Sequence, residues 1–132
     1  MVEIAKGTFK VKLQALPFEG VEAGAKLGRM SIDKEIEGDL IATTRGQMLS
    51  AMTATAGSAG YVAIEHVEGS LKGKKGSFVL QHTGVMDRGS PGLSVIVVPD
   101  SGSGELAGLT GRFDINIEAG SHRYEFEYTL PS

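Results

Sequence analysis

Residues 61–83, YVAIEHVEGSLKGKKGSFVLQHT, alternate between apolar and polar side chains on both sides of a turn that contains glycine. Successive side chains of a β-strand point to opposite faces, so this period of two predicts two strands. We place Gly73 and Lys74 at the centre of a type II′ turn, because glycine easily takes the positive φ of the first central position. The segment is therefore expected to form one long β-hairpin, and a chain organised around it must build a sheet.

One face of this hairpin combines apolar residues with a candidate acid–base pair. Counting outward from the turn places Val67 opposite Leu80 and Glu65 opposite His82. The residues that share this face are Tyr61, Ala63, Glu65, Val67, Phe78, Leu80 and His82. We therefore expect a carboxylate and an imidazole to meet on an otherwise apolar surface, within one hydrogen bond or one bridging water.

Shorter alternating segments elsewhere indicate further strands. They cover 2–14, 27–36, a third strand that includes 41–47, 93–98, a strand that begins at 105, 112–118, and a last strand after a turn at 120–121. The glycine- and proline-containing stretches 17–26 and 84–92 are expected to be loops. Residues 50–60 are small and weakly periodic, and they either finish a strand and turn or form a short helical piece.

The dipeptide Gly38-Asp39 is expected to form a two-residue turn between the second and third strands. Counting outward pairs Ile36 with Ile41, Lys34 with Thr43, Ile32 with Arg45 and Met30 with Gln47. The apolar face of the second strand carries Met30, Ile32 and Ile36. This register therefore predicts that Thr43, Arg45 and Gln47 point to the same face as those apolar residues.

A second glycine turn, Gly120-Ser121, is expected to close the last hairpin. In that register Ile117 meets Tyr124, Ile115 meets Phe126 and Phe113 meets Tyr128. On the other face Glu118 lies opposite Arg123, a favourable cross-strand contact of roughly 0.2–1 kcal/mol.

About eight strands linked mostly by short turns predict an all-β fold. Because one face of the sheet is apolar throughout, the sheet can bury that face and remove its edges by closing into a single antiparallel up-and-down β-barrel. A sandwich of two sheets is the alternative. The 19 glycines fit this interpretation, because glycine is common at strand ends, bulges and barrel corners. A barrel of this size is filled by side chains or holds one small ligand.

Composition argues against several other classes of protein. A chain of 132 residues corresponds to a single domain, 1–132. Its lack of cysteine excludes disulfides and thiolate metal sites. The net charge of −3, with both signs mixed along the chain, argues against nucleic acid or an anionic membrane as the partner. Lysines interrupt the N-terminal apolar residues, and no apolar run approaches the length of a membrane span, so we expect a cytoplasmic protein.

The stretches YVAIEHVEGSLKGKKGSFVLQHTG (61–84) and SGSGELAGLTG (101–111), preceded by the EGDL…G segment (37–46), resemble a family of small bacterial proteins of unknown function. Members of that family resemble allene oxide cyclase in fold, so the resemblance implies an eight-stranded antiparallel barrel. It implies no activity, because the family has no established one and fold alone does not transfer chemistry. No cyclase catalytic motif is matched.

The candidate ligand site consists of Glu65, His82, Arg45, Gln47, Thr43 and Tyr61. A carboxylate beside His82 would hold the imidazole in one tautomer, as a general acid or base requires. Arginine can bind a carboxylate or stabilise developing negative charge. In the alternative interpretation, Glu65 and His82 satisfy each other as a buried structural pair. We expect no metal or cofactor, because the three histidines, His66, His82 and His122, lack the paired spacing of ligands.

Three functions stay open at this point. The barrel binds a small apolar or weakly acidic metabolite, or it is an enzyme of the isomerase or cyclase kind, or it is a structural or interaction module. In the third case the lumen would be filled by Phe9, Met30, Ile32, Phe78, Leu80, Phe113 and Phe126. The other face of the central hairpin and its neighbouring strand is apolar as well, with Val62, Ile64, Val79, Ile96 and Val98. Because a large apolar patch seldom stays exposed on a monomer, this face predicts a homodimer.

Overall fold

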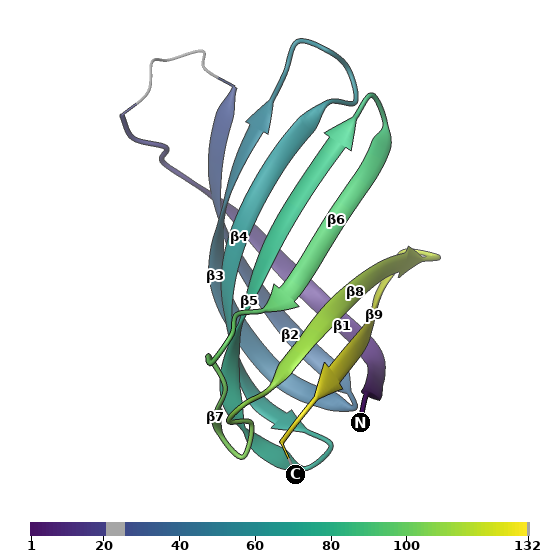
Figure 1. The fold of residues 1–132 in the computed structure, drawn as a ribbon. Helices are drawn as coiled ribbons and strands as arrows, with labels where there is room; N and C mark the ends of the chain where they lie inside the picture. The colour runs from purple at the N-terminus through teal and green to yellow at the C-terminus, as the bar shows by residue number, and fades with distance from the viewer. Residues whose placement is uncertain (21–25, 132) are drawn as a thin grey trace.

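The fold consists of nine β-strands, as described by a computed structural model for residues 1–20 and 26–131 (Figure 1). The strands are β1 (Glu3–Leu16), β2 (Leu27–Gly38), β3 (Leu40–Met52), β4 (Ala59–Leu71), β5 (Lys74–Asp87), β6 (Ser90–Val97), β7 (Ser103–Gly104), β8 (Thr110–Glu118) and β9 (Ser121–Thr129). No helix occurs within the described residues, and hence none that is long and apolar enough to cross a membrane. Five residues of the expected loop 17–26, namely 21–25, lie outside the described part of the chain.

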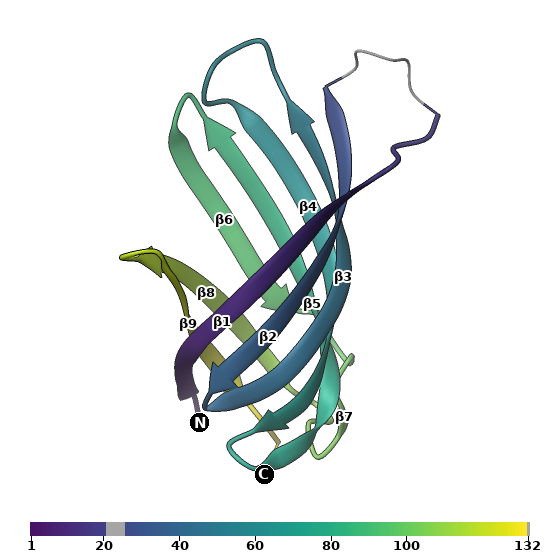
Figure 2. The ribbon, with the colours of Figure 1, turned by 180° about the vertical axis from the view of Figure 1, so that it is seen from behind.

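Eight of the strands close into an antiparallel barrel, in the order β1-β2-β3-β4-β5-β6-β8-β9 and back to β1. The two-residue strand β7 is an addition that pairs with β5. The prediction of an eight-stranded up-and-down barrel is confirmed, and the sandwich alternative is wrong. Closure between β6 and β8 rests on the pairing of Ile96 with Arg112. Above this point β6 and the β8–β9 hairpin diverge, so the upper end of the barrel is splayed (Figures 1 and 2).

Three hairpins share one kind of turn, in which glycine is the second central residue. The central pairs are Lys72-Gly73, Arg88-Gly89 and Ala119-Gly120, and φ is positive at all six residues, as a type I′ turn requires. The predicted turns at 73–74 and 120–121 are therefore displaced by one residue. This displacement moves each cross-strand partner by two positions, so Glu65 lies opposite Leu80, and Phe113 lies opposite Phe126. A shift of two residues leaves every side chain on the face that was predicted for it.

The register between β2 and β3 differs from the prediction by one residue, which has a larger effect. Ile36 pairs with Ala42 and Lys34 pairs with Thr44, so the inward-facing residues of β3 are the even-numbered ones. Leu40 at the start of β3 is fully buried. Its backbone is held by Tyr124 on β9, whose hydroxyl lies 3.0 Å from the Leu40 nitrogen and 3.2 Å from the Leu40 oxygen. This contact joins residues far apart in the sequence, and local turn chemistry does not reveal it.

In two further segments the structure differs from the expectation, and in a third it decides between the two alternatives that the sequence left open. The expected loop 84–92 is wrong, because β5 and β6 extend through it to the tight turn at Arg88-Gly89. The strand expected from 105 is wrong as well, because residues 105–108 form turns that bring Leu106 and Leu109 into the core. For residues 50–60, the strand-and-turn alternative is correct: β3 ends at Met52 and β4 begins at Ala59.

Side chains fill the lower part of the barrel interior. Phe113 lies between Tyr124 and Phe126, at ring-centroid distances of 5.0 and 5.6 Å, and Phe126 stacks on Phe78 at 5.7 Å. Burying an aromatic side chain of this kind stabilises a fold by about 1.5–3 kcal/mol, so this cluster holds the closed end together. The interior of the upper, splayed end is lined by side chains that stay partly exposed.

Candidate functional site

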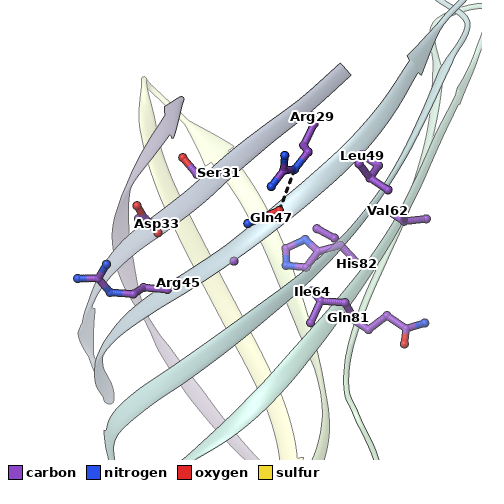
Figure 3. Close-up of a pocket in the computed structure, with 12 residues that line it drawn as sticks. Arg29, Ser31, Asp33, Arg45, Gln47, Leu49, Val62, Ile64, Gln81 and His82 are labelled. Atoms are coloured by element: carbon purple, nitrogen blue, oxygen red, sulfur yellow. Dashed lines mark hydrogen bonds between the residues drawn. The ribbon is translucent and has the colours of Figure 1, made fainter. Parts of the chain in front are cut away.

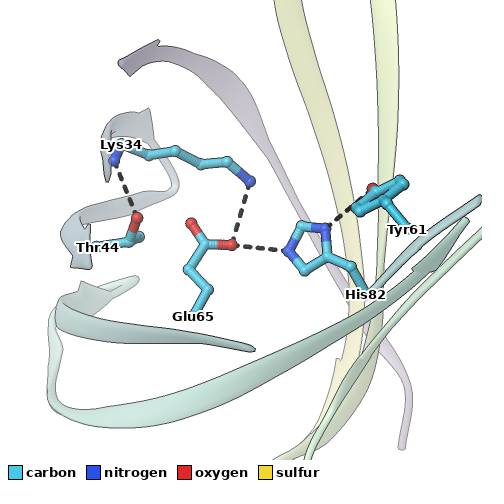
Figure 4. A network of polar contacts seen from close by, with 5 residues as sticks. All are labelled: Lys34, Thr44, Tyr61, Glu65 and His82. Atoms are coloured by element: carbon cyan, nitrogen blue, oxygen red, sulfur yellow. Dashed lines mark hydrogen bonds and ion pairs between the residues drawn. The ribbon is translucent and has the colours of Figure 1, made fainter. Parts of the chain in front are cut away.

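Glu65 of β4 and His82 of β5 form a hydrogen bond in the middle of the barrel interior (Figure 4). The Nε2 atom of His82 lies 2.8 Å from Oε1 of Glu65, and the two residues are 1% and 0% exposed. The predicted contact on a shared face is confirmed. The predicted register is wrong, because His82 lies opposite Ala63 and the pair is diagonal across the two strands.

Lys34 of β2 is the third member of this buried group. Its Nζ atom lies 3.2 Å from the same Oε1 atom of Glu65, and its side chain is 2% exposed. The ammonium also stands 4.8 Å from the centre of the Phe9 ring, where the negative face of an aromatic ring favours a cation. The sequence analysis missed this lysine as a site residue. Strand alternation was the available signal, because Lys34 lies between Ile32 and Ile36 on the apolar face of β2.

The electrostatic balance of this group keeps Glu65 ionised. Burial alone would raise the pKa of Glu65, but the hydrogen bond from His82 and the charge of Lys34 outweigh it, so the pKa lies below its ordinary value. For Lys34 burial dominates and lowers the pKa, while Glu65 opposes this effect. The ammonium and the carboxylate compensate each other's charge, which is what allows two charged groups to be buried in a barrel core.

One atom of the carboxylate lacks such compensation. Within residues 1–20 and 26–131, Oε2 of Glu65 is buried and has no hydrogen-bond partner. The neighbouring hydroxyl of Thr44 accepts a hydrogen bond from the backbone nitrogen of Lys34 at 3.0 Å. The Thr44 side chain also contributes to the low pKa of Glu65, so it is a further polar neighbour of this carboxylate.

Tyr61 of β4 connects the buried group to the upper end of the barrel. Its hydroxyl oxygen lies 3.4 Å from Nδ1 of His82, the ring nitrogen on the side away from Glu65 (Figure 4). Burial, followed by the negative charge of Glu65, raises the pKa of Tyr61. The aromatic ring covers Gly84, where an added Cβ would come within 2.2 Å of the ring. Glycine at position 84 thus allows the ring to lie flat across β5.

The pocket next to Tyr61 is the open upper end of the barrel interior, and we call it the mouth. It has a volume of about 390 Å³ and is formed by β3, β4, β5 and β6. Its lining comprises Met48, Ser50, Met52, Ala59, Gly60, Tyr61, Gly84, Val85, Met86, Pro91, Gly92 and Leu93. The volume lies within the usual range for small-molecule sites, which are typically apolar with a few polar groups. The mouth has this composition, and Ser50 and Tyr61 are the lining residues whose side chains carry a polar group.

The other three predicted site residues lie on the outside of the barrel. Thr43, Arg45 and Gln47 are exposed, so their predicted placement in the lumen is wrong. The cause is the register of β2 and β3, since a slip of one residue exchanges the two faces of a strand. The lumen therefore contains no arginine from β3, and among residues 1–20 and 26–131 the buried cation is Lys34.

Arg45 and Gln47 line a groove of about 930 Å³ on the outer face, which we call the outer groove (Figure 3). Its rim also carries Arg29, whose Nε donates to Oε1 of Gln47 at 3.0 Å and whose Nη1 donates to the Pro17 carbonyl at 3.2 Å. These contacts already use the guanidinium of Arg29. The mouth, with a buried polar group beneath it, is therefore the better candidate site.

The histidines do not come together as a ligand set. His66 lies on the exposed face of β4, and His122 on β9 packs 5.2 Å from the ring of Phe9. In the part of the chain that the structure describes, no group of three or more histidine or acidic residues has the arrangement of a metal site.

The chain is similar to proteins whose function has not been determined. The model of a family described as "Protein of unknown function (DUF3224)" matches residues 5–128. The crystal structure of a protein of unknown function from this family, from Shewanella oneidensis MR-1, is similar to this chain. The two sequences are 50% identical, and the two structures superpose with a TM-score of 0.94. The match covers 100% of this chain and 99% of that one. No curated protein matches the chain.

Proposed function

The chain belongs to the DUF3224 family of proteins of unknown function, and we propose that its barrel binds a small apolar molecule in the mouth. The observation that supports this proposal most directly is a pocket of about 390 Å³ at the open end of the interior. Apolar side chains that face the interior stay exposed there, among them Met52 at 61%, Met86 at 43% and Leu93 at 47%. Exposed apolar surface in a concave site favours occupation by an apolar ligand.

The chemistry of the lining supports a ligand of variable shape. Met48, Met52 and Met86 all border the mouth, and methionine adapts to irregular apolar surfaces because its side chain is flexible and polarisable. The weakly acidic ligand has less support than the apolar one, because Arg45 lies outside the barrel. A carboxylate in the mouth would also approach the negative charge of Glu65.

Acid–base catalysis of the isomerase or cyclase kind is the second candidate. It is favoured by one observation, the hydrogen-bonded series from Lys34 through Glu65 and His82 to Tyr61, which ends at the mouth. An enzyme would return a chemically altered ligand, whereas a binding protein would release it unchanged. Analysis of the recovered ligand by mass spectrometry and NMR separates these two functions.

Fluorescence titration with Nile red, a neutral apolar dye, tests the binding function. We expect saturable binding to the native protein and at least tenfold weaker binding to Leu93→Lys, which puts a charge into the mouth. Ile41→Lys is the matched control. Ile41 is 61% exposed, against 47% for Leu93, but it lies on the outer face of β3 and does not line the mouth. If the dye did not bind, or if both variants lost affinity for it equally, the binding function would be contradicted. The barrel would then be better explained as a structural or interaction module whose core is the filled lower lumen.

A further inference from the structure

We propose that Tyr61 presents a hydrogen-bond acceptor to the mouth, so that the preferred ligand is an apolar molecule with a hydrogen-bond donor, such as an alcohol or an amine N–H. This inference rests on the proposed function and specifies the ligand class of the same site. It follows from the protonation of three consecutive groups, Glu65, His82 and Tyr61.

The first step concerns the carboxylate of Glu65. Lys34 lies 3.2 Å from its Oε1 atom, and both side chains are buried. An ionised carboxylate has only acceptor atoms, so the short contact of 2.8 Å with His82 requires a proton on Nε2 of the imidazole. The direction of this hydrogen bond is therefore from His82 to Glu65.

The second step concerns the other ring nitrogen of His82. The charge of Glu65 is already balanced by Lys34, and the imidazole is 1% exposed. A proton on Nδ1 in addition to that on Nε2 would leave a net positive charge buried in the core, which is strongly unfavourable. The imidazole is therefore neutral, and Nδ1 is an acceptor.

The third step concerns the hydroxyl of Tyr61, which lies 3.4 Å from Nδ1. Since Nδ1 accepts, the hydroxyl donates its one proton to it. The phenolic oxygen then has only lone pairs to offer to the mouth, which Tyr61 lines. The ring cannot easily turn away, because it lies against Gly84 on the neighbouring strand.

A ligand with a donor can pair with this oxygen, whereas a ligand with only acceptors leaves it unpaired. The matched probes are naphthol and its methyl ether, which share the apolar ring system and differ in the hydroxyl proton. Because a net hydrogen bond changes an equilibrium by about tenfold or less, we expect naphthol to bind roughly five- to tenfold more tightly. Titration calorimetry at neutral pH gives both dissociation constants.

Two variants separate the hydroxyl from the apolar pocket. Tyr61→Phe keeps the ring and removes the oxygen, so both probes should still bind but with nearly equal affinity. Gly84→Ala keeps the hydroxyl but displaces the ring that carries it, so it should also reduce the preference for naphthol over its methyl ether. A nitrogen-15 NMR spectrum of the imidazoles should show His82 with a protonated Nε2 and an unprotonated Nδ1, independently of any ligand.

The outcomes distinguish this inference from the function on which it rests. Equal binding of the two probes to the native protein, a preference for the methyl ether, or a proton on Nδ1 of His82 would overturn the acceptor assignment alone. Failure of both probes to bind would overturn the binding function, and this inference with it.

Discussion

Nε2 of His82 lies 2.8 Å from Oε1 of Glu65, although the two residues are not directly opposite each other on β4 and β5. The same carboxylate oxygen also contacts Lys34 from a third strand. One oxygen therefore joins three strands of the barrel at the level where the filled interior ends and the mouth begins. The stability of the barrel and the shape of the mouth should both depend on this group.

Substitution His82→Ala should lower the free energy of unfolding by about 1.5–3 kcal/mol, because it removes the hydrogen-bond donor to the buried carboxylate of Glu65 while Lys34 still balances the charge. That is a large part of the ~5–15 kcal/mol that stabilises a domain. Urea unfolding measures the loss. As a control, Arg123→Ala removes an exposed ion pair with Glu118 and should cost less than about 1 kcal/mol. A loss near 1 kcal/mol for His82→Ala would mean that water hydrates Glu65 and that the group is open to the mouth.

Replacing both charged partners should be milder than replacing one. The double variant Lys34→Met, Glu65→Leu leaves no buried charge, whereas Lys34→Met alone leaves a carboxylate without its cation. We expect the double variant to be the more stable of the two in the same urea experiment. If the single variant were as stable as the double one, the Lys34–Glu65 contact would contribute little to the fold.

Acid should destabilise the protein through Glu65. Burial alone would raise the pKa of this residue, but His82 and Lys34 hold it below its ordinary value of 4.5. Between the two pKa values the unfolded chain binds a proton and the folded chain does not, so the stabilisation is complete above 4.5 and decreases as the pH falls toward the folded value. As the pH falls through this range, the urea concentration at the midpoint of unfolding should decrease less for Glu65→Gln than for the native protein. If the midpoints of the two proteins decreased equally with pH, Glu65 would not be the source of the acid destabilisation.

The turn at Ala119-Gly120 allows a test of the hairpin register. Ala119 has a φ of 51°, which is unfavourable for alanine and acceptable for asparagine. Ala119→Asn should therefore raise the melting temperature, with a gain of up to about 1 kcal/mol. Asp114→Asn, at an exposed position within β8, is the control and should give no such gain. In the register first expected from the sequence, Ala119 would be a strand residue and the substitution would destabilise the hairpin.

The apolar outer face predicts a homodimer. Val62 and Ile64 are 51% and 52% exposed, and Ile96 is 40% exposed. In a two-fold dimer the same surface meets itself, so these apolar side chains would be buried against their own copies. Light scattering at micromolar concentration should show a dimer for the native protein and a monomer for Ile64→Glu. A monomeric native protein would contradict this prediction.

Alternation along the strands was sufficient to predict the barrel and the inward face of β4, β5, β8 and β9. The turn assignments at Gly73 and Gly120 were wrong by one residue, but the resulting shift of two cross-strand positions preserved these faces. For this reason the contact between Glu65 and His82 could be predicted although their register was wrong.

The errors in the candidate site came from the hairpin of β2 and β3. Its turn is held by contacts from distant strands, with Tyr124 of β9 bonded to the backbone of Leu40 and Lys6 of β1 bonded to Asp39, and no local pattern contains that information. As a consequence Thr43, Arg45 and Gln47 were placed inside the barrel. Lys34 was missed for another reason, because a lysine on an apolar strand face is interpreted as exposed until a buried carboxylate is known to be its partner.

Methionine methyl NMR tests most directly whether the mouth is the binding site. The chain contains 5 methionines, of which Met48, Met52 and Met86 line the mouth, whereas Met1 is fully exposed. With carbon-13-labelled methyl groups, titration with Nile red should shift the signals of the three mouth methionines in parallel and leave that of Met1 unchanged. Saturable binding without a shift of these three signals would contradict the proposed site.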